Sequence, residues 1–196
     1  MEYQLILQNV SKHISLQENE RNYFFSILEL KEVKRKDLLL REQQICRYIY
    51  FVNRGALRAY YVDKSGREST IMFGLADWWI TDMHCFINEL PATLYVEALE
   101  DSEIVQLNKE NFQKLLVDLP VFERFFRIIF QNAYIREQLR MIENLSLTAE
   151  ERYVNFLKKY PQVQLHVTQK QIASYLGISP EFLSTIRNNL AKTKIS

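Results

Sequence analysis

Two helical segments separated by a single glycine near the end of the sequence constrain its fold more than any other feature. Thr168-Gln169-Lys170-Gln171 is a capping box, in which the Thr and Gln side chains satisfy free backbone amides, and it predicts a helix through Leu176. Gly177 follows where a helix ends in the left-handed conformation. Ser179-Pro180 then supplies an N-cap and a first-turn proline for a second helix to about Ala191. The segment is therefore predicted to form a helix-turn-helix.

The apolar residues of this segment have the spacing of a small core shared by two helices, with the small Ala173 where the helices approach. These core positions are Ile172, Leu176, Ile178, Leu183, Ile186 and Leu190. The second helix is left with a polar outer face, and in a helix-turn-helix such a face enters the DNA major groove and reaches base edges. The alternative is a structural helix pair with a polar surface, and we favour double-stranded DNA as the partner. The expected DNA contacts are Gln169, Lys170, Ser179, Glu181, Ser184, Thr185, Arg187 and Asn188.

The distribution of charge also indicates a polyanionic partner. The formal net charge of the chain is only +1, but residues 145–196 carry seven Lys and Arg against three Glu, so the rest of the chain is net acidic. Lys170, Arg187, Lys192 and Lys194 are expected to meet phosphates, which set affinity and position but carry no sequence information.

Strand-forming segments occupy the region from about residue 30 to residue 107. They are rich in β-branched and aromatic residues and lie at Arg47–Val52, Ala56–Val62, Ser69–Phe73, Leu94–Leu99 and Ile104–Leu107. Asp63-Lys64-Ser65-Gly66 is a hairpin turn between the second and third of them. Many short strands at this spacing predict a sandwich or small barrel, so we expect an α+β fold with an N-terminal antiparallel β-roll. The first 28 residues are expected to be helical and to pack on the roll.

A long helix is predicted to follow the strands. Asn108 is the N-cap of a short helix over Lys109–Leu116, and Pro120 then starts the long helix at its first turn. Residues along one side of this helix recur at alternating spacings of four and three, which is the pattern of a heptad seam. All of them are apolar except one Asn, and a buried Asn at such a position fixes the register of a dimer. Of a buried helix in a monomer and a parallel homodimer, we favour the dimer. Its expected interface is Val121, Phe125, Ile128, Asn132, Ile135, Leu139 and Ile142.

A second capping box, Thr148-Ala149-Glu150-Glu151, predicts a helix that runs to Tyr160 and stops at Pro161. Residues Val163–Val167 are expected to form a short extended segment. The chain is thus expected to divide into a β-roll sensor domain at 1–119, a dimerisation helix at 120–144 and a helix-turn-helix domain at 145–196.

Composition excludes several classes of protein. Apolar residues make up 47% of the chain and charged residues 25%, which is typical of a globular protein and excludes a disordered one. No apolar run is long enough to span a membrane, and no secretory signal is expected, so we expect a cytoplasmic location and no membrane partner. Cys46 and Cys85 are expected to be reduced thiols.

The sequence carries no motif for catalysis. It has no nucleophile elbow, no phosphate-binding loop and no His-Glu-x-x-His, so we expect that the protein is not an enzyme. The three histidines are spread over separate parts, and Asp82, His84 and Cys85 form the single cluster of metal-ligand types. In a strand Asp82 and His84 would share a face and Cys85 would point away, so no metal is expected there.

The chain from about residue 20 to residue 191 resembles the Crp/Fnr group of bacterial transcription regulators. The most specific stretches are Val52-Asn53-Arg54-Gly55 with Asp63-Lys64-Ser65-Gly66-Arg67-Glu68, and the helix-turn-helix from Thr168 to Leu190. The resemblance implies a cyclic-nucleotide-binding-like jelly roll, a dimer helix and a winged helix-turn-helix, with one recognition helix per subunit in successive major grooves. RNA polymerase is a further candidate partner.

Departures from the family pattern limit what the resemblance implies. Cyclic-nucleotide binders of the family carry a Gly-Glu pair and an Arg-Ser pair around the phosphate, whereas this chain has Thr81 and Asp82 at the first pair and Ala92 in place of the arginine. A buried phosphodiester without its guanidinium partner is costly, so tight binding of cyclic AMP or cyclic GMP is predicted to be lost and the effector to be unknown. No cysteine precedes Cys46, which excludes the iron–sulfur cluster of the oxygen-sensing branch.

The recognition helix departs as well. Pro180 stands before Glu181 and Thr185 stands where the family often has arginine, so the usual operator sequence is not expected. Few residues follow this helix, and the wing hairpin is expected to be absent or to lie elsewhere. The alternative function is a sensor with weak or vestigial DNA binding, whose pocket is lined by Trp78, Trp79, Asp82, His84, Ala92, Thr93 and Tyr95.

Overall fold

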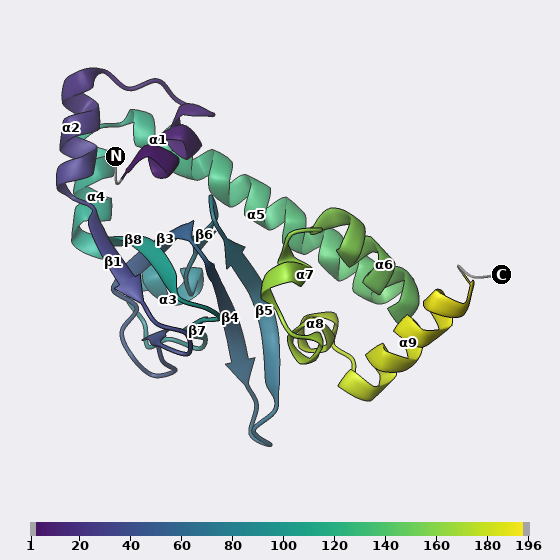
Figure 1. Ribbon diagram of the computed structural model, residues 1–196. Helices are drawn as coiled ribbons and strands as arrows, with labels where there is room; N and C mark the ends of the chain where they lie inside the picture. The colour runs from purple at the N-terminus through teal and green to yellow at the C-terminus, as the bar shows by residue number, and fades with distance from the viewer. Residues whose placement is uncertain (1–2, 194–196) are drawn as a thin grey trace.

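The structure, a computed structural model, describes residues 3–193 and has two parts joined by one long helix (Figure 1). Helices α1 (Gln4–Ser11) and α2 (Glu18–Ser26) precede a roll of strands. The elements of the roll are β1 (Glu29–Val33), β2 (Leu38–Leu40), β3 (Tyr48–Arg54), β4 (Ala56–Val62), β5 (Glu68–Leu75), β6 (Trp79–Ile80), α3 (Met83–Asn88), β7 (Tyr95–Ala98) and β8 (Ser102–Asn108). Then follow α4 (Lys109–Asp118), the long α5 (Val121–Ser146), α6 (Ala149–Lys159), α7 (Val163–His166), α8 (Gln169–Leu176) and α9 (Pro180–Thr193).

The roll consists of two four-stranded antiparallel sheets with strand orders β1-β8-β3-β6 and β2-β7-β4-β5. The α+β prediction with an antiparallel roll is confirmed. All five predicted strands are present with ends shifted by up to two residues, and β1, β2 and β6 are additional strands. The segment at residues 83–88 is a helix, not part of a strand, which changes the geometry of the predicted pocket.

Gly55 closes the tight connection between β3 and β4. Its φ is +94°, a conformation that disfavours side chains, and an added Cβ would overlap the side chain of Ser102. The Ser102 hydroxyl occupies this space because it accepts a hydrogen bond from the amide of Ala56, at 3.1 Å. The glycine therefore allows β8 to lie directly against the connection.

The first turns of α5 are buried in the roll core together with α1, α2 and α4. Phe122, Phe125 and Phe126 are almost completely inaccessible and pack, in tilted and edge-to-face arrangements, against one another and against Phe24 and Phe112. The prediction that Phe125 belongs to the dimer seam is therefore wrong. Phe125 belongs to the core of the roll, because α1, α2 and α4 cover this end of the helix, and Val121 is partly buried against the same core.

The segment after Pro161 is a single helical turn, so the prediction of an extended stretch at residues 163–167 is wrong. Val163 begins this turn, whereas Val167 is its C-cap and has extended backbone, and both side chains are buried. Val163 is therefore helical despite the preference of β-branched residues for strands.

The C-terminal helices begin and end as the sequence predicts. Thr148 and Thr168 each form a capping box, Gly177 has φ +70°, and the Ser179 hydroxyl accepts a hydrogen bond from the amide of Phe182 at 3.1 Å. The predicted helix-turn-helix core is also present, with Ile172, Ala173, Leu176, Leu183 and Ile186 buried and Ile178 and Leu190 packed against them. No strand follows β8 in residues 3–193, so no wing hairpin forms within that range.

Candidate nucleic-acid interface and effector groove

Helix α9 presents a polar face to solvent at the far end of the molecule from α1 (Figure 1). Leu183 and Ile186 are buried on one side, while Glu181, Ser184, Thr185 and Asn188 are exposed on the other. Arg187 is exposed on one flank of this face. The four residues predicted to reach base edges therefore lie together on one face.

Phe182 is a member of this surface that sequence reasoning missed. It lies in the first turn of α9, on the flank of the polar face, and its side chain is 50% exposed. The sequence did contain a signal for this role. Phe182 directly precedes Leu183 of the helix-turn-helix core, so its side chain points away from that core. An exposed aromatic ring at the start of a recognition helix is suited to contact with a thymine methyl group.

The remaining predicted DNA contacts have mixed roles. Gln169 and Lys170 are exposed in the first turn of α8. Ser179 is engaged as the N-cap of α9. Hydrogen bonds from its own backbone N–H and from the Ser179 hydroxyl lower the pKa of Glu181, so its carboxylate is an acceptor at neutral pH. Lys194 lies outside the described residues.

The first helix of the helix-turn-helix is docked on the edge strand β5. The Ser174 hydroxyl accepts a hydrogen bond from the amide of Thr70 at 2.8 Å and donates one to the carbonyl of Glu68 at 2.9 Å. Arg140 of α5 donates to the carbonyl of Ile71 on the same strand, at 2.8 Å. These side chains satisfy polar groups of an exposed sheet edge and fix α8 relative to the roll.

A groove of about 680 Å³ lies between the roll and α5. Of the predicted pocket residues, Trp78, Trp79, Asp82, His84 and Thr93 line it, and α5 contributes Ile129 and Phe130 among others. The structure does not bring the other two to this groove. Ala92 is fully buried, and Tyr95 stacks on Tyr60 with ring centroids 5.2 Å apart.

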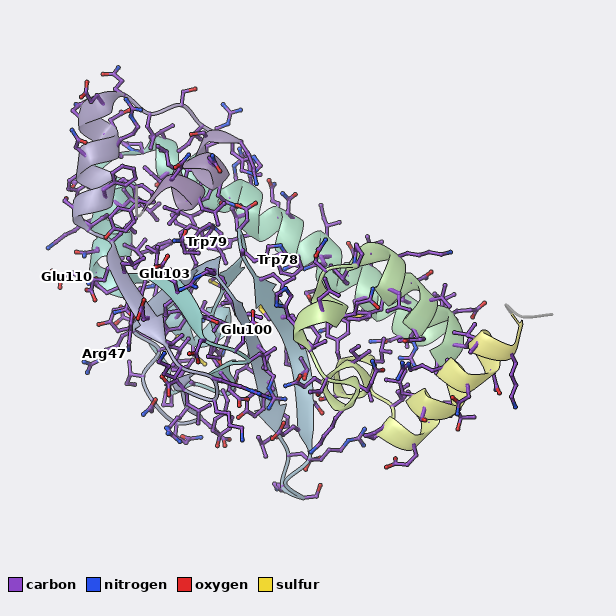
Figure 2. All side chains as sticks on the ribbon, in the orientation of Figure 1. Arg47, Trp78, Trp79, Glu100, Glu103 and Glu110 are labelled. Carbon is purple, nitrogen blue, oxygen red and sulfur yellow. The ribbon has the colours of Figure 1, made fainter. Side chains whose placement is uncertain are left out.

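The two neighbouring tryptophans point to opposite sides (Figure 2). Trp79 donates from its indole N–H to the Asn9 side chain at 3.0 Å and packs edge-on against Phe125 and Phe126. Trp78 faces the C-terminal helices, with its ring 5.8 Å from that of Tyr160. Trp79 is thus part of the packing of the roll against α5, while Trp78 links the roll to the C-terminal helices.

Asp82 is the N-cap of α3, and its carboxylate is fully engaged. It accepts hydrogen bonds from the amide of Cys85 at 3.3 Å, the amide and hydroxyl of Thr93 at 2.8 and 3.0 Å, and the amide of Leu94 at 3.0 Å. Burial by itself raises the pKa of Asp82, but these hydrogen bonds outweigh burial and hold the pKa below its usual value. The strand geometry assumed for Asp82 and His84 is wrong, because the chain turns into α3 here.

Comparisons with known proteins agree with this architecture. The family model of the cyclic nucleotide-binding domain matches residues 30–118. FnrA, a transcriptional activator protein of Stutzerimonas stutzeri, is 25% identical over 167 residues, which cover 80% of this chain and 68% of FnrA. FixK2 from Bradyrhizobium japonicum has a similar structure, with a TM-score of 0.75 at 20% identity over 86% of this chain and 87% of FixK2. A regulator of the crp/fnr family from Eubacterium rectale has a TM-score of 0.72 at 16% identity, over 91% of this chain and 85% of its own.

These comparisons show a cyclic nucleotide-binding domain in the chain and a likeness to regulators of the Crp/Fnr family. The family resemblance drawn from the sequence is thereby confirmed. In this chain the roll, the long helix and the helix-turn-helix follow one another in the expected order.

The residues at the nucleotide-phosphate position of this chain differ from those expected to hold a cyclic nucleotide. Thr93 stands where the family's nucleotide binders have the serine of the Arg-Ser pair, and its hydroxyl and amide are already bonded to Asp82. Ala92 offers no charge at the arginine position. The Asp82 carboxylate already accepts hydrogen bonds from these donors and would repel an incoming phosphate. Ala92 supplies no positive charge to offset that of the phosphate.

The two cysteines of the chain are buried and lie in separate settings. The Cys46 sulfur lies 3.2 Å from the Thr81 hydroxyl, and the Cys85 thiol donates to the carbonyl of Pro91 at 3.0 Å. Burial raises the pKa of both thiols. Within residues 3–193 no group of three or more His, Cys, Asp or Glu side chains is arranged to hold a metal, and no helix there is long and apolar enough to cross a membrane.

Replacing Asp82 by asparagine is expected to lower the free energy of unfolding by about 1.5–3 kcal/mol at pH 7, because a charged acceptor of buried N–H groups is lost. The depressed pKa of Asp82 means that the carboxylate stabilises the fold above its unfolded pKa and loses this effect as the pH falls through its folded pKa. The difference between wild type and Asp82→Asn should therefore shrink below about pH 4. Urea denaturation at a series of pH values measures it.

Asp63→Asn is the matched control, because Asp63 is an exposed carboxylate in the β4–β5 hairpin whose pKa is also lowered, by hydrogen bonds from Ser65 and Arg67. Its effect should be much smaller. An equal effect of the two substitutions would contradict the assignment of Asp82 as a buried anionic cap.

Proposed function

We propose that the protein is a sequence-specific, DNA-binding transcription regulator that acts as a homodimer. The observation that carries this is the exposed polar face of α9, opposite a fully buried apolar row and preceded by the tight turn at Gly177. That geometry allows a helix to enter a major groove while α8 crosses the backbone. The names of the relatives, transcriptional activators and regulators, support the same function.

The exposed half of α5 supports a homodimer. After the buried first turns, Ile135, Leu139 and Ile142 of the predicted seam are each about half exposed, and Asn132 is exposed beside them. Leu145, one turn further and 84% exposed, extends the row beyond the predicted interface. A row of this kind along one helix is typical of a parallel coiled-coil contact. Two copies joined here would supply two recognition helices to successive grooves of a near-palindromic site.

The outer face of α9 is suited to base contacts that do not involve arginine. Asn188 can pair bidentately with adenine, and the Glu181 carboxylate accepts from a cytosine amino group. Phe182 adds an apolar contact with thymine. Lys170 and Arg187 have no ion pair among the described residues and are placed for phosphates.

Control by cyclic AMP or cyclic GMP is not part of this proposal, because Asp82 occupies the donors of the phosphate site and Ala92 replaces the arginine. We infer instead an effector of another kind, or none. We also propose that the protein contacts RNA polymerase, lies in the cytoplasm and has no catalytic activity. A sensor with vestigial DNA binding is the alternative that the experiment below distinguishes.

Fluorescence anisotropy across a salt series tests the proposal. The purified full chain is titrated against the DNA upstream of its own gene, with a random duplex of equal length as the control. Binding that prefers the upstream DNA and weakens steeply with salt is expected. Absence of salt-dependent binding to either duplex would contradict the DNA-binding function and leave the sensor.

Two variants separate base contacts from phosphate contacts. Asn188→Ala should weaken binding to the preferred duplex by about 1–3 kcal/mol and leave binding to the random duplex unchanged. Lys170→Gln should weaken both and reduce the salt slope by about one. The reverse pattern would contradict the assigned roles.

A further inference from the structure

A second groove, of about 400 Å³, lies between the roll and the C-terminal helices. The roll contributes the β3–β4 connection with Arg54 and Gly55, and Leu75, Ala76 and Trp78 from the end of β5 and the turn after it. The other wall is the end of α6, the turn after it and α7, residues 159–163 and His166. Trp78 also lines the groove beside α5.

The charge of this lining is one-sided. Arg54 and Lys159 are exposed cations on opposite walls, and no carboxylate is among the lining residues. Neither cation has an ion pair with a carboxylate within 4 Å in the described chain. The charge of Arg54 contributes to lowering the pKa of Asp101, but the ion pair of Asp101 is with Lys34, at 2.9 Å. Glu100 pairs with His166 at 2.8 Å.

The other lining residues are apolar or aromatic. Trp78 and Tyr160 meet edge to face, and Leu75, Ala76 and Val163 lie beside them. Flat rings of this kind present faces and edges on which a planar ligand can stack. The groove has the size of a usual small-molecule site, lies between two structural units and is lined by a few convergent polar groups.

We propose that this groove is a binding site for a small aromatic carboxylate, with the ring against Trp78 and Tyr160 and the carboxylate between Arg54 and Lys159. Arg54 offers a planar fork that matches a carboxylate, and Lys159 adds a point charge from the facing wall. The groove beside α5 is a poor competitor for such an anion, because its lining includes Asp77, Asp82 and Glu137 against the single cation Arg136. A ligand held here touches the roll and the C-terminal helices at once.

The test uses benzoate as the probe, benzamide as its uncharged counterpart, and the ¹⁵N-labelled full chain without DNA, so that its outcome is independent of DNA binding. Benzoate should shift the NMR signals of the Gly55 amide, the Trp78 indole N–H and the His166 amide, and should bind at least tenfold more tightly than benzamide. Arg54→Gln combined with Lys159→Gln should weaken benzoate binding at least tenfold and leave benzamide binding unchanged.

Lys158→Gln is the matched control, because Lys158 is exposed on the same helix but does not line the groove. It should change benzoate affinity by less than twofold. All substituted side chains are exposed, so the fold is expected to persist, and the spectrum of each variant verifies this directly. Equal affinity for benzoate and benzamide, or shifts at Trp79 and His84 in place of Gly55, would overturn the proposal.

Discussion

Substitution of Ile135 and Leu139 by aspartate is expected to convert the proposed homodimer into a folded monomer. Both side chains are about half exposed in the single chain, so their replacement leaves the core intact. In a dimer they would lie in the seam, where four buried carboxylates without partners cannot be accommodated. Sedimentation equilibrium should show a monomer, and circular dichroism should show an unchanged helical content.

The same double variant should bind the preferred upstream duplex roughly a hundredfold or more weaker than wild type. In a monomer, binding of one recognition helix no longer raises the effective concentration of a second helix at the other half-site. Val117→Asp is the control, since Val117 is an equally apolar and even more exposed residue on α4, away from the seam. It should stay dimeric and keep its DNA affinity. A double variant that remains dimeric would contradict the seam, whatever its DNA affinity.

Replacement of Arg58 by methionine is expected to lower the free energy of unfolding by about 3 kcal/mol or more. Arg58 is a buried residue of β4 whose guanidinium lies 2.7 Å from the Glu68 carboxylate on β5 and 2.8 Å from that of Glu97 on β7. It also lies over the ring of Tyr60, 4.0 Å from the centroid. Burial alone lowers the pKa of Arg58, but the two carboxylates outweigh it and raise the pKa, so the cation stays charged.

The cost of Arg58→Met arises because Glu97 is left buried without its partner, while Glu68 is more exposed and is solvated. Urea denaturation at fixed protein concentration measures it. Arg67→Met, an exposed arginine of the neighbouring hairpin, should change stability by less than about 0.5 kcal/mol. Adding Glu97→Leu to Arg58→Met should restore part of the loss. A loss below about 1 kcal/mol for Arg58→Met would show that the ion cluster is not a determinant of stability.

The prediction was most accurate where local chemistry decides the structure. Capping boxes at Thr148 and Thr168, the left-handed Gly177 and the hairpin turn ending at Gly66 each act within a few residues, and all are present. The recognition face of α9 follows from the same local information, because helical periodicity places Glu181 and Asn188 opposite Leu183. These features could be read without knowing what lies elsewhere in the chain.

The prediction failed where distant segments decide. Phe125 has the heptad spacing of an interface residue, but α1, α2 and α4 bury it, and no pattern within α5 distinguishes the two outcomes. The strand geometry considered for Asp82, His84 and Cys85 is absent, because Asp82 caps a helix over residues 83–88. The other partners of Asp82 are Thr93 and Leu94, across a loop. Val163 likewise begins a helical turn although it is β-branched, and its side chain is buried.

The sequence by itself determined the order of roll, long helix and helix-turn-helix, the surface proposed to read DNA and the loss of the phosphate-binding arginine. Only the tertiary structure decided which half of α5 is free to pair, that Asp82 takes the donors of the phosphate site, and that Arg54 and Lys159 face each other across a groove. The reason is physical: caps, turns and periodicity depend on neighbours a few residues away, whereas burial and charge pairing depend on segments that only folding brings together.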